Sequence, residues 1–391
     1  MWKKSSKYYF FIYICIFSLF KFSYSQSECK PYPTIENGIL IKNCKPYKAI
    51  GVNYYDAFLQ VLRNPNKKLY KKHFKILGKK GIPFIRVNIG GYYPEDWNIY
   101  LKNKKLYFSL LDEFIQTAEK NNIGLVITLF WHIYTIPNIL NEPPSSIGNP
   151  NSKTTKFIKN FTSQIVNRYK NSSAIWVWEF GNEYNLFSDI PDKRKTRKFK
   201  IKKLKIKWCD IVASYLIFYD TVRKIDKKRL ISTGNSLLRP NSYHLAFYEK
   251  WKIDSLQQFK FMFKIFNPDI YNLISIHLYL NYLKKYKYFG IYSFEELLTF
   301  IKKIAISRKQ ILFIGEFGVC RKNSIDLKTE RKIFIEMLNT IKENDIKLSA
   351  LWVYNRSKND PCNVTFENDR NYQLEYILKL NQEFQNKNSY H

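Results

Sequence analysis

The sequence predicts a parallel (β/α)8 barrel, the TIM-barrel class of α/β fold, preceded by a short N-terminal β-hairpin. Apolar strand-like segments alternate with amphipathic helix-like segments along most of the chain. The strand-like segments are nearly continuous apolar runs, as expected for strands that are covered on both faces. The length of 391 residues suits one large barrel, and a hydrophobic share of 45% is sufficient for its core.

Eight strands are expected, each followed by a helix-like segment. The predicted strands are 49–53, 83–88, 125–130, 175–180, 229–233, 273–279, 311–316 and 348–354. The predicted helices are 68–79, 106–120, 153–169, 198–227, a less regular 241–266, 294–306, 328–343 and 372–383. A doubly wound open sheet is the alternative fold, but no glycine-rich phosphate-binding turn follows the first strand. We therefore expect a barrel.

The first 25 residues have the features of a secretory signal peptide. Lys3, Lys4 and Lys7 precede an apolar run over residues 8–20, and small residues follow that run. A membrane anchor formed by residues 8–20 is the alternative, although this run is short for a bilayer span. We therefore expect a secreted or periplasmic protein with a single domain over residues 26–391.

An exported protein can form disulfides, and the positions of the cysteines suggest two. Cys29 and Cys44 flank the hairpin-like segment, so we predict a bond between them. Cys320 and Cys362 each follow a predicted barrel strand and are a second candidate pair. Cys209, on a predicted helix, would then remain a free thiol. The Cys and His residues have no spacing that resembles a metal site, so no metal is expected.

The net charge of +33 does not by itself indicate a nucleic-acid-binding protein. Its basic residues are mostly Lys spread along the chain, whereas nucleic-acid binding typically uses clustered Arg in a recognisable motif. The stretch 193–207 carries ten positive charges. It is expected either to be a solvated helix face or to contact an anionic cell envelope or an acidic glycan. We expect no nucleic-acid partner and a monomer.

Two glutamates are expected at the carboxyl ends of strands, where barrels of this class carry their catalytic groups. Glu183 follows the strand 175–180 in the sequence Gly-Asn-Glu-Tyr, and Glu316 ends the strand 311–316. Hydrolysis of a glycosidic bond uses such a pair, one as acid/base and one as nucleophile. Glu179, inside the first of these strands, is expected to be buried and structural.

Other strand ends carry polar and aromatic residues in a recognisable order. In chain order, the set reads Arg86, His132, Asn182-Glu183, His277-Leu278-Tyr279, Glu316 and Trp352. This set resembles the active site of glycoside hydrolase family 5, the cellulase family within the clan of retaining barrel-fold glycosidases. The resemblance spans about 270 residues and implies a retaining glycosidase that needs no cofactor.

The resemblance implies that Glu183 is the acid/base and Glu316 the nucleophile. Glu316 must be ionised to attack the anomeric carbon, and the guanidinium of Arg86 would lower its pKa. Tyr279 would orient the same carboxylate through a hydrogen bond. Glu183 must start protonated, which requires a dry site and a nearby negative charge.

The remaining residues of the set would support this chemistry. His132 and His277 would tune the proton on Glu183 and bind sugar hydroxyls. Asn182 would bind the 2-hydroxyl group, a contact that can strengthen in an oxocarbenium-like transition state. Trp352 would form an apolar floor beneath the reacting sugar.

Other aromatic residues are expected beside the strand-end loops, where a glycan would run. They are Tyr54, Tyr55, Tyr92, Tyr93, Trp97, Trp131 and Tyr184. The three histidines without such a context, His73, His244 and His391, are expected on the surface.

The sequence therefore predicts an exported retaining β-glycosidase that hydrolyses a β-linked polysaccharide or oligosaccharide. A β-glucan is the favoured substrate, and a β-mannan is the alternative. A barrel that binds glycan without cleaving it is a further alternative. Such a protein is expected to lack one of the two carboxylates or Arg86, and all three are present.

Overall fold

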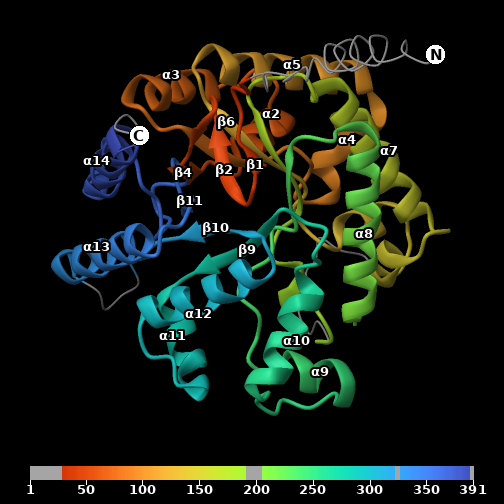
Figure 1. The fold of residues 1–391 in the computed structure, drawn as a ribbon. Helices are drawn as coiled ribbons and strands as arrows, with labels where there is room; N and C mark the ends of the chain where they lie inside the picture. The colour runs from red at the N-terminus through yellow and green to blue at the C-terminus, as the bar shows by residue number, and fades with distance from the viewer. Residues whose placement is uncertain (1–28, 191–204, 322–325, 388–391) are drawn as a thin grey trace, which may run out of the picture.

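The structure, a computed structural model, describes residues 29–190, 205–321 and 326–387 (Figure 1). Its main sheet has eight strands: β4 (Ala49–Asn53), β5 (Phe84–Asn88), β6 (Gly124–Phe130), β7 (Ile175–Gly181), β8 (Leu230–Ser232), β9 (Leu273–Leu278), β10 (Ile311–Phe317) and β11 (Leu348–Leu351). The strand order is β8-β7-β6-β5-β4-β11-β10-β9, and every pair of neighbours is parallel. The sheet curls until β8 and β9 face each other, which gives the predicted (β/α)8 barrel.

Side chains bridge the seam between β8 and β9, where the described residues form no backbone ladder. The side-chain oxygen of Asn272 accepts a hydrogen bond from the backbone N–H of Ile231 at 3.3 Å. The hydroxyl of Ser275 donates to the backbone oxygen of Asn235 at 3.0 Å. These contacts supply the polar partners that a ladder would otherwise provide.

Helices surround the barrel (Figure 1). They are α2 (Ala57–Arg63), α3 (Tyr70–Lys80), α4 (Asn98–Lys102), α5 (Lys104–Lys120), α6 (Thr135–Ile139), α7 (Lys153–Tyr169), α8 (Trp208–Ile225), α9 (Ser242–Tyr248), α10 (Leu256–Phe266), α11 (Leu280–Tyr286), α12 (Phe294–Ser307), α13 (Leu327–Glu343) and α14 (Asn371–Lys387). Several begin at a side-chain cap. The Ser293 hydroxyl, for example, accepts from the backbone N–H of Glu296, whose carboxylate accepts from the N–H of Ser293.

The predicted barrel strands and helices are present, and four short α-helices, α2, α4, α6 and α11, lie in segments where no helix was predicted. The irregular segment 241–266 is two helices, α9 and α10, joined by a loop. The last barrel strand ends at Leu351 rather than at residue 354. The helix predicted over 198–227 is described from Trp208, because residues 191–204 lie outside the described part of the chain.

The lower half of the barrel interior is an apolar layer. Alternate residues of a strand point to opposite faces, so every second residue points inward. Near the amino ends of the strands, these inward residues include Phe84, Phe313 and Leu348, which belong to one buried cluster. Leu40 and Tyr47, from the N-terminal hairpin segment, belong to the same cluster. The hairpin therefore closes the bottom of the barrel.

The hairpin is a small antiparallel sheet of β1 (Thr34–Glu36), β2 (Ile39–Lys42) and β3 (Lys45–Pro46). The predicted bond between Cys29 and Cys44 is present beside it.

The other cysteines also follow the prediction. Cys320 and Cys362 form a second disulfide, and Cys209 is a free, exposed thiol. The Cys320–Cys362 bond ties the segment after β10 to the segment after β11.

The prediction for the isolated histidines was wrong for two of them. His244 is buried, and its Nδ1 lies 2.7 Å from a carboxylate oxygen of Asp254. His73 is half-buried, with Nδ1 3.0 Å from the hydroxyl of Tyr354 and Nε2 3.0 Å from the side-chain nitrogen of Asn355. Both histidines are held by polar partners, which sequence spacing did not reveal.

The two ends of the chain are described only in part. The predicted signal peptide, residues 1–25, and His391 lie outside the described residues. Within residues 29–190, 205–321 and 326–387, no helix combines the length and hydrophobicity needed to cross a membrane.

Candidate active site

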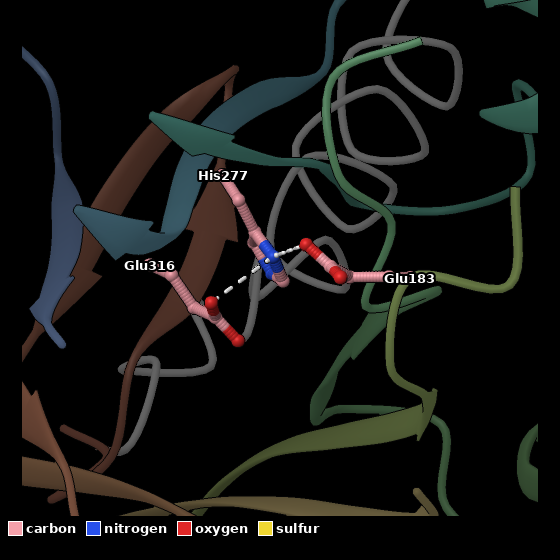
Figure 2. Close-up of side chains that lie close together, drawn as sticks. All are labelled: Glu183, His277 and Glu316. Atoms are coloured by element: carbon pink, nitrogen blue, oxygen red, sulfur yellow. Dashed lines mark hydrogen bonds and ion pairs between the residues drawn. The ribbon is translucent and has the colours of Figure 1, made fainter. Parts of the chain in front are cut away.

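The upper half of the barrel interior is polar, and it holds the predicted carboxylates. Glu316 ends β10 next to His277 of β9, and Glu183 approaches from the turn after β7 (Figure 2). His277 Nδ1 lies 2.8 Å from Glu183 Oε1 and 3.4 Å from Glu316 Oε2. One imidazole nitrogen therefore faces both carboxylates.

Glu183 is presented by a tight turn at the end of β7. Its backbone is left-handed, with φ 56°, which is uncommon for a residue other than glycine. Its N–H donates to the backbone oxygen of Gly234 at 2.9 Å, which anchors the turn to the segment after β8. The Glu183 side chain is 28% exposed, so it borders the open end of the barrel.

Glu316 points inward because of a bulge in β10. Ile314 pairs with Ile276 and Glu316 pairs with His277, so β10 advances two residues for one residue of β9. In regular alternation Glu316 would point outward, to the helices, and the extra residue reverses this. The extra residue is Gly315, where a Cβ atom would lie 3.1 Å from His277 Nε2.

Arg86 of β5 is the centre of the polar layer and is fully buried. Its Nε donates to Glu179 Oε1 at 2.7 Å, and its Nη1 donates to Glu316 Oε1 at 3.0 Å. Nη1 also donates to the side-chain oxygen of Asn53 at 3.2 Å, and Nη2 donates to that of Asn182 at 2.8 Å. A single guanidinium therefore fixes four side chains.

Glu179 is buried, as predicted, and it orients Arg86. Besides the bond from Arg86, its Oε1 accepts from the Thr128 hydroxyl at 2.6 Å and its Oε2 from the Ser232 hydroxyl at 3.0 Å. Thr128 and Ser232 lie on the strands that flank β7. A carboxylate bound from three sides can hold its arginine in one orientation.

Asn53, at the end of β4, was not predicted as a site residue. Its amide donates to the backbone oxygen of Gly315 at 2.9 Å and accepts from Arg86. It therefore joins the bulge of β10 to the guanidinium. Its place at a strand end was a signal in the sequence, but Asn is common at such positions.

The second oxygen of Glu316 is held by Tyr279. The hydroxyl of Tyr279 donates to Glu316 Oε2 at 2.6 Å. Oxygens of Glu183 and Glu316 lie within 4.8 Å of each other. This spacing is near the value of about 5–5.5 Å for retaining glycosidases and below the 6.5–9.5 Å or so of inverting ones.

The pKa directions of the two carboxyls are the reverse of the prediction from the sequence. Burial raises the pKa of Glu316, and the charge of Glu183 adds to the rise, against the effects of His277, Arg86 and Tyr279. Burial acts to raise the pKa of Glu183 too, but its interactions with His277, Ser236 and Arg86 lower it. The reversal follows because Glu316 is the deeper group and His277 lies closer to Glu183.

The other nitrogen of His277 indicates how the ring is protonated. Nε2 is buried and has no hydrogen-bond partner among the described residues. A proton there would leave a buried N–H group unpaired, which is costly. The favoured state carries the proton on Nδ1, from which it is donated to Glu183.

Three aromatic rings form a floor beside the carboxylates. Trp352 stacks on Tyr55 at 5.3 Å between ring centroids and 21° between ring planes. Trp131 lies close to both rings, 5.1 Å from Tyr55 and 6.4 Å from Trp352 between ring centroids. The guanidinium carbon of Arg86 lies 4.8 Å from the Trp131 ring centroid, which links the floor to the polar layer.

Three aromatic residues predicted along the glycan path are core residues instead. Tyr54, Trp97 and Tyr184 are at most 3% exposed. Trp97 packs against Phe161, and the Tyr184 hydroxyl donates to the backbone oxygen of Phe130. Their position after strands was informative, but large rings near strand ends also fill the space between strands and helices.

Of the other four, Trp131 is buried in the floor, and Tyr55, Tyr92 and Tyr93 are half-buried. Tyr92 packs against His132, whose Nδ1 accepts from the backbone N–H of Tyr134 at 3.3 Å. His132 therefore belongs to the wall of the site rather than to the layer around Arg86.

The same carboxylates and His277 are the one group of three or more possible metal ligands in the described residues. Their donor atoms are already engaged by Arg86, Tyr279 and one another. The guanidinium that contacts Glu316 would repel a cation. The arrangement suits proton and glycosyl transfer rather than metal binding.

The sequence profile described as cellulase (glycosyl hydrolase family 5) matches residues 46–358 of this chain. The chain therefore belongs to glycosyl hydrolase family 5. It is a retaining glycoside hydrolase, and the matched region contains the whole of the barrel strand set and both glutamates. No curated protein matches the sequence.

Solved structures of the family are similar in fold. A family 5 mannosidase from Rhizomucor miehei has a TM-score of 0.64 at 15% identity, covering 91% of this chain and 99% of that chain. An endo-β-1,4-mannanase from Thermotoga petrophila has a TM-score of 0.61 at 13% identity, with coverages of 86% and 77%. An endoglucanase from Thermotoga maritima has a TM-score of 0.54 at 16% identity, with coverages of 84% and 96%.

Proposed function

We propose that this protein cleaves a β-linked polysaccharide with Glu183 as acid/base and Glu316 as nucleophile. The observation that carries the proposal is the unequal support of the two carboxylates. Both oxygens of Glu316 accept hydrogen bonds, from Arg86 and Tyr279, which hold it in one position for attack. Glu183 is partly exposed, as a group that meets the leaving oxygen and then water must be.

The first step forms a covalent bond between Glu316 and the anomeric carbon. The bond from that carbon to the leaving oxygen breaks, and the oxygen takes the proton of Glu183. In the second step Glu183 takes a proton from water, whose oxygen replaces Glu316 at the anomeric carbon. The second step restores the proton of Glu183 and frees the carboxylate of Glu316, so no cofactor is needed.

The pKa directions in the substrate-free site differ from those that the first step needs. The pKa of Glu316 is raised and that of Glu183 is lowered, whereas the first step needs an ionised Glu316 and a protonated Glu183. We expect bound substrate to reverse this order, because a sugar that separates Glu183 from His277 removes the contact that lowers the pKa of Glu183.

The favoured substrate is a β-linked glucan, and a β-mannan is the second candidate. Asn182, oriented by Arg86, is proposed to contact the 2-hydroxyl, the group at which glucose and mannose differ. The mannan candidate gains support from the Rhizomucor mannosidase, which has a higher TM-score than the Thermotoga maritima endoglucanase. A Thermotoga maritima protein of this group was also solved with mannotriose.

Product analysis on β-glucans, β-mannans, xylans and aryl glycosides tests this proposal. We expect reducing sugars from glucan or mannan and none after Glu316→Gln, which keeps the size of the side chain. Binding of these glycans without turnover by the wild-type protein would instead support the glycan-binding alternative.

The proposed enzyme is an exported monomer whose signal peptide is residues 1–25. The support is the sequence pattern alone, and mass spectrometry of protein from the medium tests it. A mature chain that begins near residue 26 is expected, while full-length protein in washed membranes would favour an anchor at residues 8–20. For the stretch 193–207, of which residues 193–204 lie outside the described part of the chain, the alternatives are a solvated helix face and a contact with an anionic envelope or an acidic glycan. Failure to bind such polymers at low salt would exclude the contact.

A further inference from the structure

A cluster of apolar side chains lies exposed on α9, α10 and the loop between them. This α9–α10 patch consists of Phe247, Tyr248, Trp251, Ile253, Leu256 and Phe261, which are between 37% and 62% exposed. The two helices lie together at the lower end of the molecule as drawn in Figure 1, opposite α3 and α5. Contiguous exposed apolar surface of this kind marks a contact site in soluble proteins.

The fold does not need the patch for its own core. On α10 the buried residues are Phe259, Met262, Phe263 and Phe266, which form the face that packs inward. Leu256 and Phe261 are outside this face and exposed, so α10 carries apolar residues on two sides. A helix needs only one apolar stripe to pack on a barrel.

The rings of the patch are not arranged as a platform for sugars. Phe247 lies 4.7 Å from Tyr243 at 46° and 6.3 Å from Phe261 at 44° between ring planes. In contrast, the rings of Tyr55 and Trp352 in the active site are only 21° apart. A polysaccharide chain would stack on nearly parallel rings, so a glycan is not the occupant that this geometry favours.

The polar groups in and around the patch are basic. The loop alternates lysine with apolar residues in the sequence Lys250-Trp251-Lys252-Ile253, and both lysines are exposed. The two acidic residues of this segment are already paired: Glu249 with Lys205, and the buried Asp254 with His244.

The lysines of the loop therefore face solvent with an uncompensated positive charge. Exposed Lys260 and Lys264 on α10 add to it, although Lys264 pairs with Asp269.

We propose that the α9–α10 patch docks this enzyme on an anionic lipid bilayer. Trp251 and Ile253, at the loop between the helices, would enter the boundary between headgroups and acyl chains with Phe247 and Phe261 beside them. Lysines that alternate with these residues would contact the acidic headgroups through their long side chains. The two contributions together explain why exposed apolar residues and lysines share one surface.

The test is sedimentation of the complete mature protein with vesicles. Vesicles of about 30% phosphatidylglycerol in phosphatidylcholine are compared with vesicles of phosphatidylcholine alone. We expect binding to the anionic vesicles, a weaker interaction with the neutral ones, and loss of binding as salt is raised. The variant Trp251→Ser/Ile253→Ser is expected to weaken binding by about tenfold or more, because two inserting side chains are removed.

Matched control variants distinguish binding by the patch from nonspecific hydrophobic adsorption and from attraction by net charge alone. Leu101→Ser removes an exposed apolar residue on α4, 43% exposed against 37% for Ile253, and is expected to bind as wild type. Lys250→Glu/Lys252→Glu is expected to abolish the preference for anionic vesicles. Lys67→Glu/Lys105→Glu changes the net charge equally, at exposed positions elsewhere, and is expected to have a small effect. Circular dichroism and thermal unfolding verify the fold of each variant.

Three results would overturn the proposal. One is absence of binding to anionic vesicles by the wild-type protein. Another is equal binding by the wild type and the loop variant, which would place the contact elsewhere. The last is that the patch variants bind vesicles as the wild type does but lose another interaction. That interaction would be a concentration-dependent dimer, or retention on β-glucan or β-mannan.

Discussion

The barrel interior has two halves that are built from the same strands and behave differently. In β5, Phe84 belongs to the lower apolar layer, and Arg86, two residues later, is the centre of the polar layer. In β10, Phe313 is in the lower layer and Glu316 in the upper one. Along one strand, the inward residue in the lower half packs in the apolar layer, and the inward residue in the upper half belongs to the polar layer of the active site.

The two layers make different demands on their residues. The lower layer requires volume, because its members form a buried apolar cluster with residues of the hairpin that covers them. The upper layer requires hydrogen-bond and ion-pair partners, because a buried charge that has no partner strongly destabilises the fold. Substitutions in the lower layer should therefore change stability, and substitutions in the upper layer should change rates.

Phe313→Ala is expected to have the largest effect on stability. It leaves a cavity in the lower layer and should lower the free energy of unfolding by about 3–5 kcal/mol. The kcat well below the unfolding transition should be nearly unchanged. Denaturant unfolding and initial rates measure the two effects. The exposed Phe247→Ala is the control, and a Phe313→Ala protein with normal stability but low kcat would break the distinction between the layers.

The hairpin disulfide is expected to have the next largest effect. Cys29 and Cys44 are 15 residues apart in the sequence, so the chain-entropy model gives the bond about 3 kcal/mol. Cys29→Ser/Cys44→Ser should unfold at lower denaturant concentration and retain full activity when folded. Cys209→Ser, at the free thiol, controls for the change of residue type. Equal unfolding midpoints for the double variant and the wild type would show that the bond does not stabilise the bottom of the barrel.

Glu179→Gln is expected to lower kcat by about 100-fold, or about 2.7 kcal/mol in activation free energy. The variant keeps the size of the side chain but removes the charge that orients Arg86, and it touches no substrate. Glu330→Gln is its matched control, because Glu330 is an equally buried carboxylate paired with Arg370 and Arg321 outside the barrel. Both should lose stability, but only Glu179→Gln should lose kcat at unchanged KM. An equal loss of kcat in both variants would contradict the role assigned to Glu179.

The smallest expected effects are shifts in the pH dependence of kcat, which reports the pKa values of the enzyme–substrate complex. The acid limb reports protonation of Glu316, and the alkaline limb reports loss of the proton from Glu183. Tyr279→Phe removes a hydrogen bond to ionised Glu316, so its pKa should rise further and the acid limb should move to higher pH. His277→Asn removes an interaction that lowers the pKa of both carboxyls, so both limbs should move to higher pH. Movement of either limb to lower pH would contradict these assignments.

The sequence predicted the strands and the strand-end residues because both depend on local patterns. Apolar runs identify buried strands, and the parallel barrel places all their carboxyl ends at one side. Knowledge of the strands was therefore enough to bring Arg86, Glu183, His277 and Glu316 together.

Features that depend on register and depth were not predictable in the same way. The bulge at Gly315 decides that Glu316 points inward, and it is a property of the β9–β10 pairing rather than of either strand. The pKa directions depend on distances of 2.8 and 3.4 Å from one nitrogen of His277. Tyr54 packs on His73 and Tyr354, and Trp97 packs on Phe161, so the burial of both rings depends on segments that lie elsewhere in the sequence.

The central claim is the division of labour between Glu183 and Glu316, and azide rescue tests it most directly. Glu183→Ala should still transfer glycosyl from an activated aryl glycoside to Glu316 and then stall, because that leaving group needs no proton. Added azide should speed release and give a β-glycosyl azide, while Glu316→Ala should give no β-azide. A β-azide from Glu316→Ala, or a first product of inverted anomeric configuration from the wild type, would contradict the account.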